Sequence, residues 1–325
     1  MRRTRRRSLV AAVLALTMVV AACGEADDAD SAAQDEEEPL ALDLEESDEA
    51  TEDEEEADEA EATEDDEASD EAAFDLEAAV ADYASSIPED FNSEGDTEAF
   101  KEALQVEEAV IIDVREEEEY AEGHIPGAIN IPLRTVAENL DAIPTDRPVW
   151  TYCRTGWRAN LVTSSLGILG YDNVTTYVPS AVGWEEAGEE LVTEGNQPED
   201  FGDPGFEPEL VEAVHGFLST VPDDYYTNSR DDVKGALAAG ATMVDVREPG
   251  EYDEGHVPDA VSVPIRSIPA NQEDVPTDSN VMVMCRSGVR AAVALPIFHV
   301  LGYTNAQGYP GSFLDWEGAG EPLTS

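Results

Sequence analysis

The stretch CRTGWR at residues 153–158 is the most informative part of this chain, and it recurs as CRSGVR at residues 285–290. A short apolar run, at 149–152 or 281–284, precedes each stretch and indicates a buried strand. A helical pattern follows each stretch. This order of strand, loop and helix is typical of a parallel sheet that is covered by helices on both faces.

The likeness between the two stretches extends far beyond the loops. Residues 113–191 align with residues 245–323 at a constant offset of 132, with 35 identical residues over 79 positions. A period of this length indicates a duplicated domain rather than a solenoid. Further elements follow the same order in each copy, namely strands at 109–112 and 242–244 and helices at 158–169 and 290–301. We therefore predict an α/β fold of two domains, each a central, mainly parallel sheet with helices on both faces, at residues 73–197 and 201–325.

Each loop places a cysteine, Cys153 or Cys285, at the carboxyl end of a strand, where ligands bind in open α/β sheets. The following helix directs its first N–H groups and the positive end of its dipole at the loop. These groups favour the thiolate, which is the reactive form of cysteine. They would also stabilise a bound anion or the terminal sulfur of a Cys-S-S⁻ persulfide. Cys153 and Cys285 are therefore the predicted catalytic residues.

The other loop residues are predicted to bind the substrate. The glycine lets the backbone turn inward without a Cβ clash. The first arginine of each loop can face an anionic donor such as thiosulfate, and the second can brace the loop or contact the same anion. The residues with this predicted role are Arg154, Thr155, Gly156, Trp157, Arg158, Arg286, Ser287, Gly288, Val289 and Arg290. Because Trp157 is replaced by Val289 in the second loop, we expect the two sites to differ in donor or acceptor.

The loops resemble the six-residue active-site loop of the rhodanese sulfurtransferases, which is of the type C-R-[ST]-G-x-R. DVR at 113–115 and 245–247 also resembles a motif of that family, as do GHIPGA at 123–128 and GHVPDA at 255–260. The resemblance covers nearly all of residues 75–325. It implies a structural role for Asp113, Arg115, His124, Asp245, Arg247 and His256.

The spacing from cysteine to arginine separates two chemistries. Related phosphatases have C-x5-R, a longer loop that encloses a tetrahedral phosphate, whereas both copies here have C-x4-R. Sulfur transfer is therefore favoured over phosphate hydrolysis or arsenate reduction. The chain also departs from the family pattern. VPS at 178–180 and PGS at 310–312 replace a Gly-Gly pair, and Pro296 should kink its helix or expose a carbonyl.

The resemblance implies an enzyme, a sulfurtransferase that works by double displacement. A donor such as thiosulfate or a persulfide gives its sulfane sulfur to the cysteine, and a thiol or cyanide acceptor removes it. Neither domain holds a second cysteine, so the acceptor is an outside molecule, which includes a protein acceptor, or the sister domain. The alternatives are a non-catalytic rhodanese-fold binding module and a sulfur carrier at the cell surface. No metal-site spacing and no glycine-rich nucleotide loop occurs, so we expect no cofactor and no metal.

The N-terminus predicts export. Residues 1–22 hold five arginines and then a short apolar run that ends in VAAC, of which Cys23 is the cysteine. The run is too short to span a bilayer. It resembles a bacterial lipoprotein signal, which implies cleavage before Cys23, a lipid on its sulfur and anchoring at the outer face of the cell membrane. An ordinary signal peptide with an incidental cysteine is the alternative.

Residues 23–72 are predicted to be an acidic, disordered linker. Positions 25–72 hold 27 of the 75 acidic residues and neither Lys nor Arg. Such a composition buries too little apolar surface to offset the cost of ordering, and its like charges keep the chain extended. The formal net charge of −58 also repels nucleic acid, so we expect no nucleic-acid partner.

Overall fold

The computed structural model describes residues 74–325, apart from residues 90, 92 and 107. The predictions for the signal peptide, for Cys23 and for the acidic linker lie outside the described residues. Within the described residues, the chain forms no helix with the length and apolar character needed to cross a membrane.

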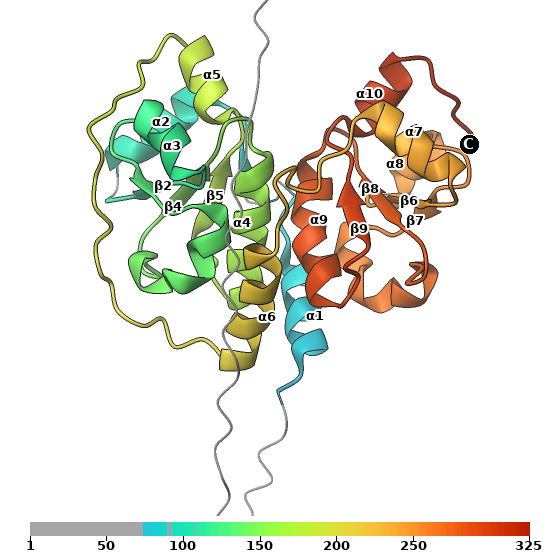
Figure 1. Ribbon diagram of the computed structural model, residues 1–325, viewed down its shortest axis with the longest axis horizontal. Coiled ribbons are helices and arrows are strands. Elements are labelled where there is room, and N and C mark those ends of the chain that lie inside the picture. Colours follow the sequence, from blue (N-terminus) through green and yellow to red (C-terminus); the bar gives the residue numbers. More distant parts are fainter. Residues whose placement is uncertain (1–73, 90, 92, 107) are drawn as a thin grey trace, which may run out of the picture. The chain divides into compact units, whose positions relative to one another are not determined.

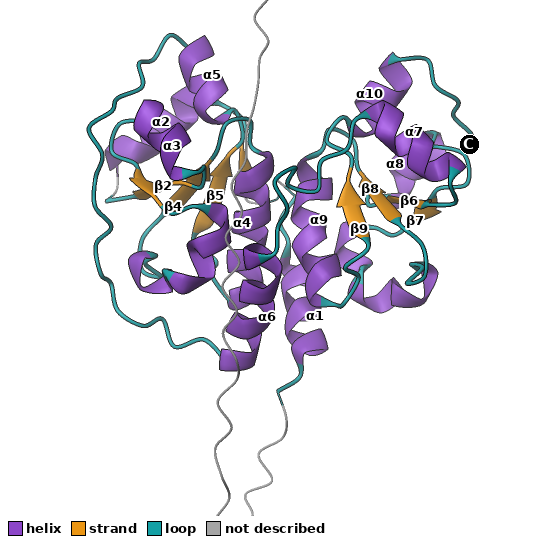
Figure 2. Ribbon diagram, in the orientation of Figure 1, coloured by secondary structure: helices purple, strands orange, loops and turns teal. Residues whose placement is uncertain are grey.

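The first repeat contains a five-stranded sheet in the order β1-β5-β4-β2-β3, and every pair of strands is parallel (Figures 1 and 2). The strands are β1 Ser93–Glu94, β2 Val110–Asp113, β3 Ile129–Asn130, β4 Val149–Tyr152 and β5 Val174–Tyr177. In the register of β2 and β4, Asp113 lies opposite Tyr152. The carboxyl ends of these two central strands therefore lie side by side, and Cys153 follows directly.

The second repeat contains a parallel sheet in the order β7-β6-β8-β9. Its strands are β6 Thr242–Asp245, β7 Val261–Ser262, β8 Val281–Met284 and β9 Ala306–Gly308. An isolated parallel bridge between Thr227 and Gly308 occupies the place of the β1–β5 pairing. The predicted α/β class, with two parallel-sheet domains, is confirmed.

Ten α-helices and four short 3-10 helices accompany the strands of the described residues. The first repeat has α1 Leu76–Ser86, α2 Thr97–Val106, α3 Glu117–Glu122, α4 Trp157–Leu169 and α5 Ser180–Glu186, with η1 Leu133–Glu138 and η2 Leu140–Ala142. The second has α6 Pro208–Ser219, α7 Arg230–Ala238, α8 Pro249–Glu254, α9 Val289–Val300 and α10 Ser312–Gly318, with η3 Ile265–Ser267 and η4 Pro269–Asp274.

Two central helices, α4 and α9, join the repeats (Figure 1). Nearly all residues of both helices are buried, because each lies between its own sheet and the other repeat. Helix α9 continues through Pro296. One turn before this proline, the Val293 carbonyl accepts a hydrogen bond from Ser164 Oγ of α4 at 2.7 Å. This contact joins the two domains, whereas the carbonyl that loses its helical N–H partner to Pro296 is that of Ala292, four residues earlier.

The N-terminal helix of each repeat packs against the opposite repeat. Helix α6 lies on η1 and α4 of the first repeat, and α1 lies mainly on η3 and η4 of the second. Equivalent arginines fix the ends of the two helices. Arg134 Nε donates to the Val221 carbonyl and Arg266 Nε to the Ile87 carbonyl, both at 2.8 Å. The two sequence-defined domains therefore exchange their first helices, and the described residues form one compact unit.

Candidate active site

The loop of the first repeat folds back onto the sulfur of Cys153, which is 1% exposed. The Gly156 N–H donates to Cys153 Sγ at 3.1 Å. Gly156 has a φ of 91°, and a Cβ at this position would lie 2.6 Å from the Val178 carbonyl oxygen. Only glycine fits here. Helix α4 begins at the next residue, so its unpaired first N–H groups and its dipole also face the loop.

The loop of the second repeat has the same geometry. The Gly288 N–H donates to Cys285 Sγ at 3.1 Å, and Cys285 is likewise 1% exposed. Gly288 has a φ of 96°, and a Cβ there would overlap the Pro310 carbonyl oxygen. The same contact between backbone and sulfur therefore occurs in both copies.

A buried serine supports each cysteine from behind. Ser180 Oγ accepts the Cys153 N–H at 3.2 Å, and Ser312 Oγ accepts the Cys285 N–H at 3.1 Å. Ser312 Oγ also lies 3.8 Å from Cys285 Sγ. Both serines have positive φ values, 58° and 51°, and strained backbone of this kind clusters at active sites. Neither serine was predicted as a site residue, because the two segments differ from a Gly-Gly pair. A signal was nevertheless present, since serine is the one residue that VPS and PGS share.

The helix after each serine turns the loop amides inward. In the first repeat, the N–H groups of Ala181 and Val182 bind the carbonyls of Cys153 and Arg154, both at 3.1 Å. The carbonyl and the N–H of one peptide point in opposite directions. The amides of the next residues therefore point away from α5, toward the loop interior. Phe313 and Leu314 make the same contacts in the second repeat, with Cys285 and Arg286.

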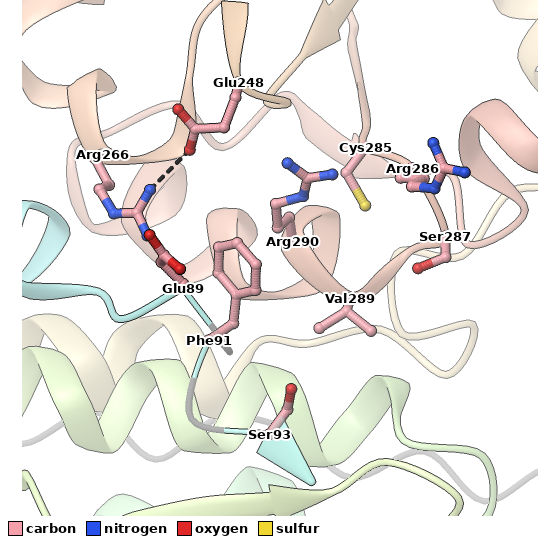
Figure 3. Close-up of a pocket in the computed structure, with 10 residues that line it drawn as sticks. All are labelled: Glu89, Phe91, Ser93, Glu248, Arg266, Cys285, Arg286, Ser287, Val289 and Arg290. Carbon is pink, nitrogen blue, oxygen red and sulfur yellow. Dashed lines mark hydrogen bonds and ion pairs between the residues drawn. The ribbon is translucent and has the colours of Figure 1, made fainter. Parts of the chain in front are cut away.

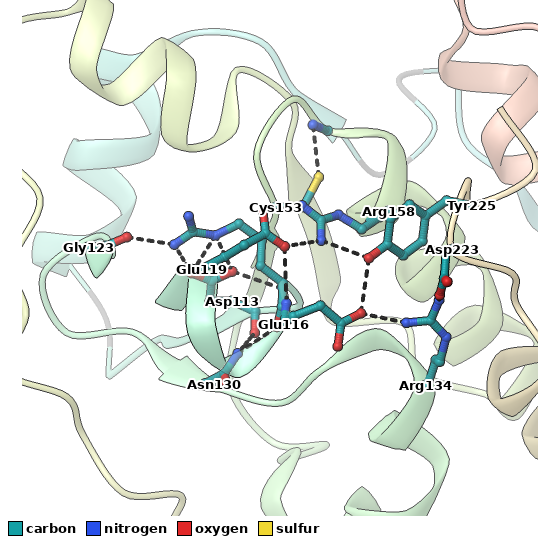
Figure 4. Close-up of polar contacts among 12 residues, drawn as sticks. Asp113, Glu116, Glu119, Gly123, Asn130, Arg134, Cys153, Arg158, Asp223 and Tyr225 are labelled. Carbon is teal, nitrogen blue, oxygen red and sulfur yellow. Dashed lines mark hydrogen bonds and ion pairs between the residues drawn. The ribbon is translucent and has the colours of Figure 1, made fainter. Parts of the chain in front are cut away.

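The second arginine of each loop is held by a glutamate (Figure 4). Arg158 donates to both carboxylate oxygens of Glu119, at 2.5 and 2.8 Å. These hydrogen bonds hold the pKa of Glu119 below its usual value. Burial alone would lower the pKa of Arg158, but Glu119 and the nearby charge of Cys153 outweigh burial and raise it. Of the two roles predicted for this arginine, the structure thus contains the bracing contact.

Arg290 makes the same double hydrogen bond with Glu251 in the second repeat, and Arg290 lowers the pKa of that carboxyl. The sequence analysis did not single out either glutamate. A signal was present, because the run EEEE at 116–119 aligns with EPGE at 248–251. Only its first and last glutamates recur in the second copy. Both recurring positions form ion pairs, since Glu116 and Glu248 bind Arg134 and Arg266.

The first arginine of each loop, Arg154 or Arg286, is exposed. Neither side chain forms an ion pair or a hydrogen bond with another described residue. The neighbouring Thr155 and Ser287 are exposed as well. These four side chains are therefore available to an incoming anion.

A buried ion pair fixes the end of the strand beside the first cysteine. Arg115 donates from Nε to Asp113 Oδ1 at 2.9 Å and from Nη2 to Oδ2 at 2.6 Å, and Nη2 also binds the Gly123 carbonyl. Arg247 makes the same contacts with Asp245 and the Gly255 carbonyl. The first ion pair holds the turn at 123–128 against the end of β2, and the second holds the turn at 255–260 against the end of β6.

The histidines of the GHIPGA and GHVPDA motifs, His124 and His256, lie in those turns. The ring of His124 stacks on Tyr120 at a centroid distance of 3.7 Å, and its Nδ1 lies 2.9 Å from the Tyr120 carbonyl oxygen. His256 stacks on Tyr252 in the same way. Within the described residues, neither histidine forms a hydrogen bond with a cysteine.

Trp157 turns away from the first site and into the opposite repeat. Its Nε1 donates to the Tyr225 carbonyl at 2.9 Å, and its ring lies directly against Gly308 of β9. The indole ring thus forms part of the contact between the repeats. The substrate-binding role of Trp157 stays a prediction: the backbone of this residue belongs to the loop, whereas its ring contacts the opposite repeat.

A cavity of about 660 Å³ opens onto Cys285 (Figure 3). It is lined from the second repeat by Glu248, Arg266, Cys285, Arg286, Ser287, Val289 and Arg290, and from the first by Glu89, Phe91 and Ser93. A smaller cavity of about 260 Å³ lies between the two active-site loops, with Thr155 to Trp157 on one side and Ser287 to Val289 on the other. The described residues contain no group of three or more His, Cys, Asp or Glu side chains arranged to hold a metal ion.

Two segments of this chain match the same known protein family. The model of the rhodanese-like domain matches residues 96–187 and again 229–319, which together are more than half of the chain.

Curated relatives match about one repeat at a time. A sulfurtransferase of Allochromatium vinosum is 32% identical over 83 residues, which are 26% of this chain and 78% of that protein. The thiosulfate sulfurtransferase GlpE of Actinobacillus succinogenes is 32% identical over 85 residues, 26% of this chain and 77% of that protein. A Bacillus subtilis relative is matched over only 52% of its length.

Among solved structures, the Escherichia coli 3-mercaptopyruvate sulfotransferase SseA is similar at 21% identity and a TM-score of 0.34. The match covers 68% of this chain and 98% of that one.

Proposed function

Because this chain belongs to the rhodanese family, we propose that it is a sulfurtransferase that carries sulfane sulfur as a persulfide on Cys153 and Cys285. The observation that carries the proposal is the pair of N–H···Sγ contacts at 3.1 Å from Gly156 and Gly288. A backbone donor aimed at sulfur stabilises the thiolate. After sulfur uptake, the inward-facing amides can stabilise the charge on the terminal sulfur in the same way.

The reaction that we propose is a double displacement. The cysteine thiolate attacks the sulfane sulfur of the donor. A Cys-S-S⁻ bond forms as the donor bond breaks, which releases sulfite from thiosulfate or a thiolate from an organic persulfide. An acceptor then attacks the terminal sulfur and regenerates the cysteine thiolate. Cyanide leaves as thiocyanate, and a thiol leaves as a persulfide. Thiosulfate as the donor is supported by the similarity to GlpE of A. succinogenes, which is named a thiosulfate sulfurtransferase.

Both copies support an enzyme over a binding module, because each keeps its cysteine, its glycine contact and its braced arginine. Hand-over of sulfur from one cysteine to the other is a further part of the proposal, because neither domain holds a second cysteine of its own. A C285S variant whose turnover equals that of the wild type would exclude this hand-over.

The proposal also includes the location of the protein in the cell. The N-terminal sequence supports export and a lipid on Cys23, with residues 23–72 as a spacer between the membrane and the two domains. A C23S variant should then be lost from the membrane fraction. Equal membrane association of both proteins would refute the anchor.

The activity is tested by intact mass on residues 73–325, as wild type, C153S and C285S. Incubation with thiosulfate, or separately with glutathione persulfide, should add the mass of one sulfur atom per reactive cysteine, and cyanide should remove it. No added sulfur from either donor, with both thiols still open to alkylation, would refute the enzyme and leave the binding module. Loading without turnover would identify a sulfur carrier.

A further inference from the structure

Each active site is completed by an aromatic residue from the opposite repeat. Phe91 follows IPED at 87–90, and Tyr225 follows the equivalent VPDD at 221–224. Both residues have positive φ values, 56° and 52°. The helix exchange carries Tyr225 to the Cys153 site and Phe91 to the Cys285 site. The two sites therefore receive equivalent residues that differ by one hydroxyl group.

At the Cys153 site, the Tyr225 hydroxyl joins two ion pairs (Figure 4). It accepts a hydrogen bond from Arg158 Nη1 at 3.2 Å and donates one to Glu116 Oε1 at 3.0 Å. Its ring also lies beneath two guanidinium groups, at 4.8 Å from Arg158 and 5.3 Å from Arg134. The hydroxyl thus links the Arg158 pair to the Arg134–Glu116 pair, and the ring is held against Arg158, which itself belongs to the Cys153 loop.

At the Cys285 site, Phe91 lies against the equivalent arginines without such a link (Figure 3). Its ring is 5.5 Å from the guanidinium of Arg290 and 5.8 Å from that of Arg266. Arg266 pairs with Glu248 at 2.7 Å. Because phenylalanine has no hydroxyl, the aromatic residue leaves the two ion pairs of this site separate.

The cavity in front of Cys285 suits an organic ligand. Its volume of about 660 Å³ lies in the range of roughly 300–1,000 Å³ that is typical of sites for organic molecules, and it far exceeds the size of a small inorganic dianion. Phe91 and Val289 supply apolar surface, and Arg286 supplies an exposed charge. A ligand with both a carbon skeleton and a carboxylate is complementary to this combination.

We propose that Tyr225 and Phe91, each supplied by the opposite repeat, determine which sulfur compound each cysteine accepts. Tyr225 restricts Cys153 to small inorganic donors such as thiosulfate. Phe91 leaves Cys285 open to organic persulfides that carry a carboxylate, whose carbon skeleton packs on Phe91 and Val289 and whose carboxylate pairs with Arg286. This assignment rests on the proposed persulfide chemistry and adds the substrate class of each site.

The chain provides its own matched test, the reciprocal variants Y225F and F91Y, each of which changes a single oxygen atom. Full-length wild type and both variants are loaded with thiosulfate or with glutathione persulfide. Peptide mass spectrometry then gives the initial rate of sulfur uptake at each cysteine separately. In the wild type, the ratio of organic to inorganic loading should be higher at Cys285 than at Cys153. Y225F should raise this ratio at Cys153, and F91Y should lower it at Cys285, each at least about fivefold, since the Tyr225 hydroxyl makes two hydrogen bonds.

Two results would overturn the assignment. One is an equal donor ratio at the two cysteines of the wild type, and the other is a ratio that neither variant changes. If no sulfur reaches either cysteine, the proposed function itself fails, which is a different outcome. A second measurement then still reports access to each thiol. The rate of alkylation by a bulky maleimide is divided by the rate of alkylation by iodoacetamide. This quotient should be higher at Cys285 than at Cys153, and in Y225F the quotients of the two cysteines should lie closer together. Equal quotients would contradict the proposal.

Discussion

Substitution of Gly156 by alanine tests the argument that links the loop backbone to the sulfur. The substitution forces an alanine into a φ of 91° and places its Cβ 2.6 Å from the Val178 carbonyl oxygen. Gly302 is a matched control. It has a φ of 95°, but a Cβ there would meet no atom within 4 Å. G302A therefore measures the backbone strain alone, and G156A measures strain together with the clash.

The left-handed conformation costs an alanine about 1–2 kcal/mol, of which about 0.4–1 kcal/mol is offset because the unfolded chain becomes stiffer. G302A should thus lower the free energy of unfolding by about 1 kcal/mol. The clash adds the cost of overpacking, about 1–3 kcal/mol, so G156A should lower it by about 2–4 kcal/mol. Urea unfolding at neutral pH measures both values.

The clash also moves the Gly156 N–H away from Cys153 Sγ. A hydrogen bond to a charged group contributes about 1.5–3 kcal/mol, which is roughly tenfold to a hundredfold in rate. Sulfur uptake at Cys153 should slow by this factor in G156A, whereas uptake at Cys285 in the same molecule should not change. If G156A is as stable as G302A and Cys153 loads at the wild-type rate, the reasoning about this loop is wrong.

Three further predictions concern the supporting residues. S312A leaves the buried Cys285 N–H without its acceptor, so it should cost about 1–3 kcal/mol of stability and slow sulfur uptake at Cys285 alone; unchanged uptake would exclude this role. Arg290 lowers the pKa of Glu251 in the folded state below the ordinary glutamate pKa of 4.5. The pair therefore stabilises the fold fully at pH values above 4.5, and this stabilisation is lost as the pH falls through the folded-state pKa. Urea midpoints at pH 7 and below pH 4 should therefore differ less in E251Q than in the wild type, and an equal difference would contradict the pairing. Burial against Phe217 and Tyr226 lowers the pKa of His299, so stability should fall as the pH drops below 6.5, and thermal melts of H299Q should lack that step.

The sequence predicted the sheets and the cysteine loops because local pattern and position agree there. Each loop is preceded by a strand that ends at the cysteine and is followed by a helix, and this order fits few folds. Both copies predicted the same fold. The predicted helix at 158–169 begins one residue earlier in the structure, at Trp157. Glu119 was missed because a run of four glutamates looks like a solvated face until it is compared with the second copy. Ser180 was missed because the sequence shows neither that its hydroxyl accepts the Cys153 N–H nor that its φ is positive, although the serine recurs in the second copy as Ser312.

The helix exchange could not be predicted from the sequence, for a physical reason. In a duplicated domain, the surface that receives the N-terminal helix exists twice, once in the same repeat and once in the other. The two surfaces have the same residue pattern, so hydrophobic periodicity fits both equally well. Arg134 and Arg266 illustrate this, since each makes the same contact with the helix end of the opposite copy. The offset between the copies changes from 132 within the domains to 134 at residues 87–91 and 221–225, but this change by itself does not distinguish the two arrangements.

The exchange bears on two of the differences between the two sites. The cysteines, the two loop arginines, the glycine and the supporting serine are identical in both repeats. Two positions that differ lie where a loop meets the opposite repeat, at Trp157 and Val289 and at the aromatic pair of Tyr225 and Phe91. At Cys285, the group that donates to the sulfur comes from the second repeat, whereas the approach to the cysteine is lined by both repeats, with Phe91 from the first. Access to one cysteine can therefore change without any change in the loop that activates it.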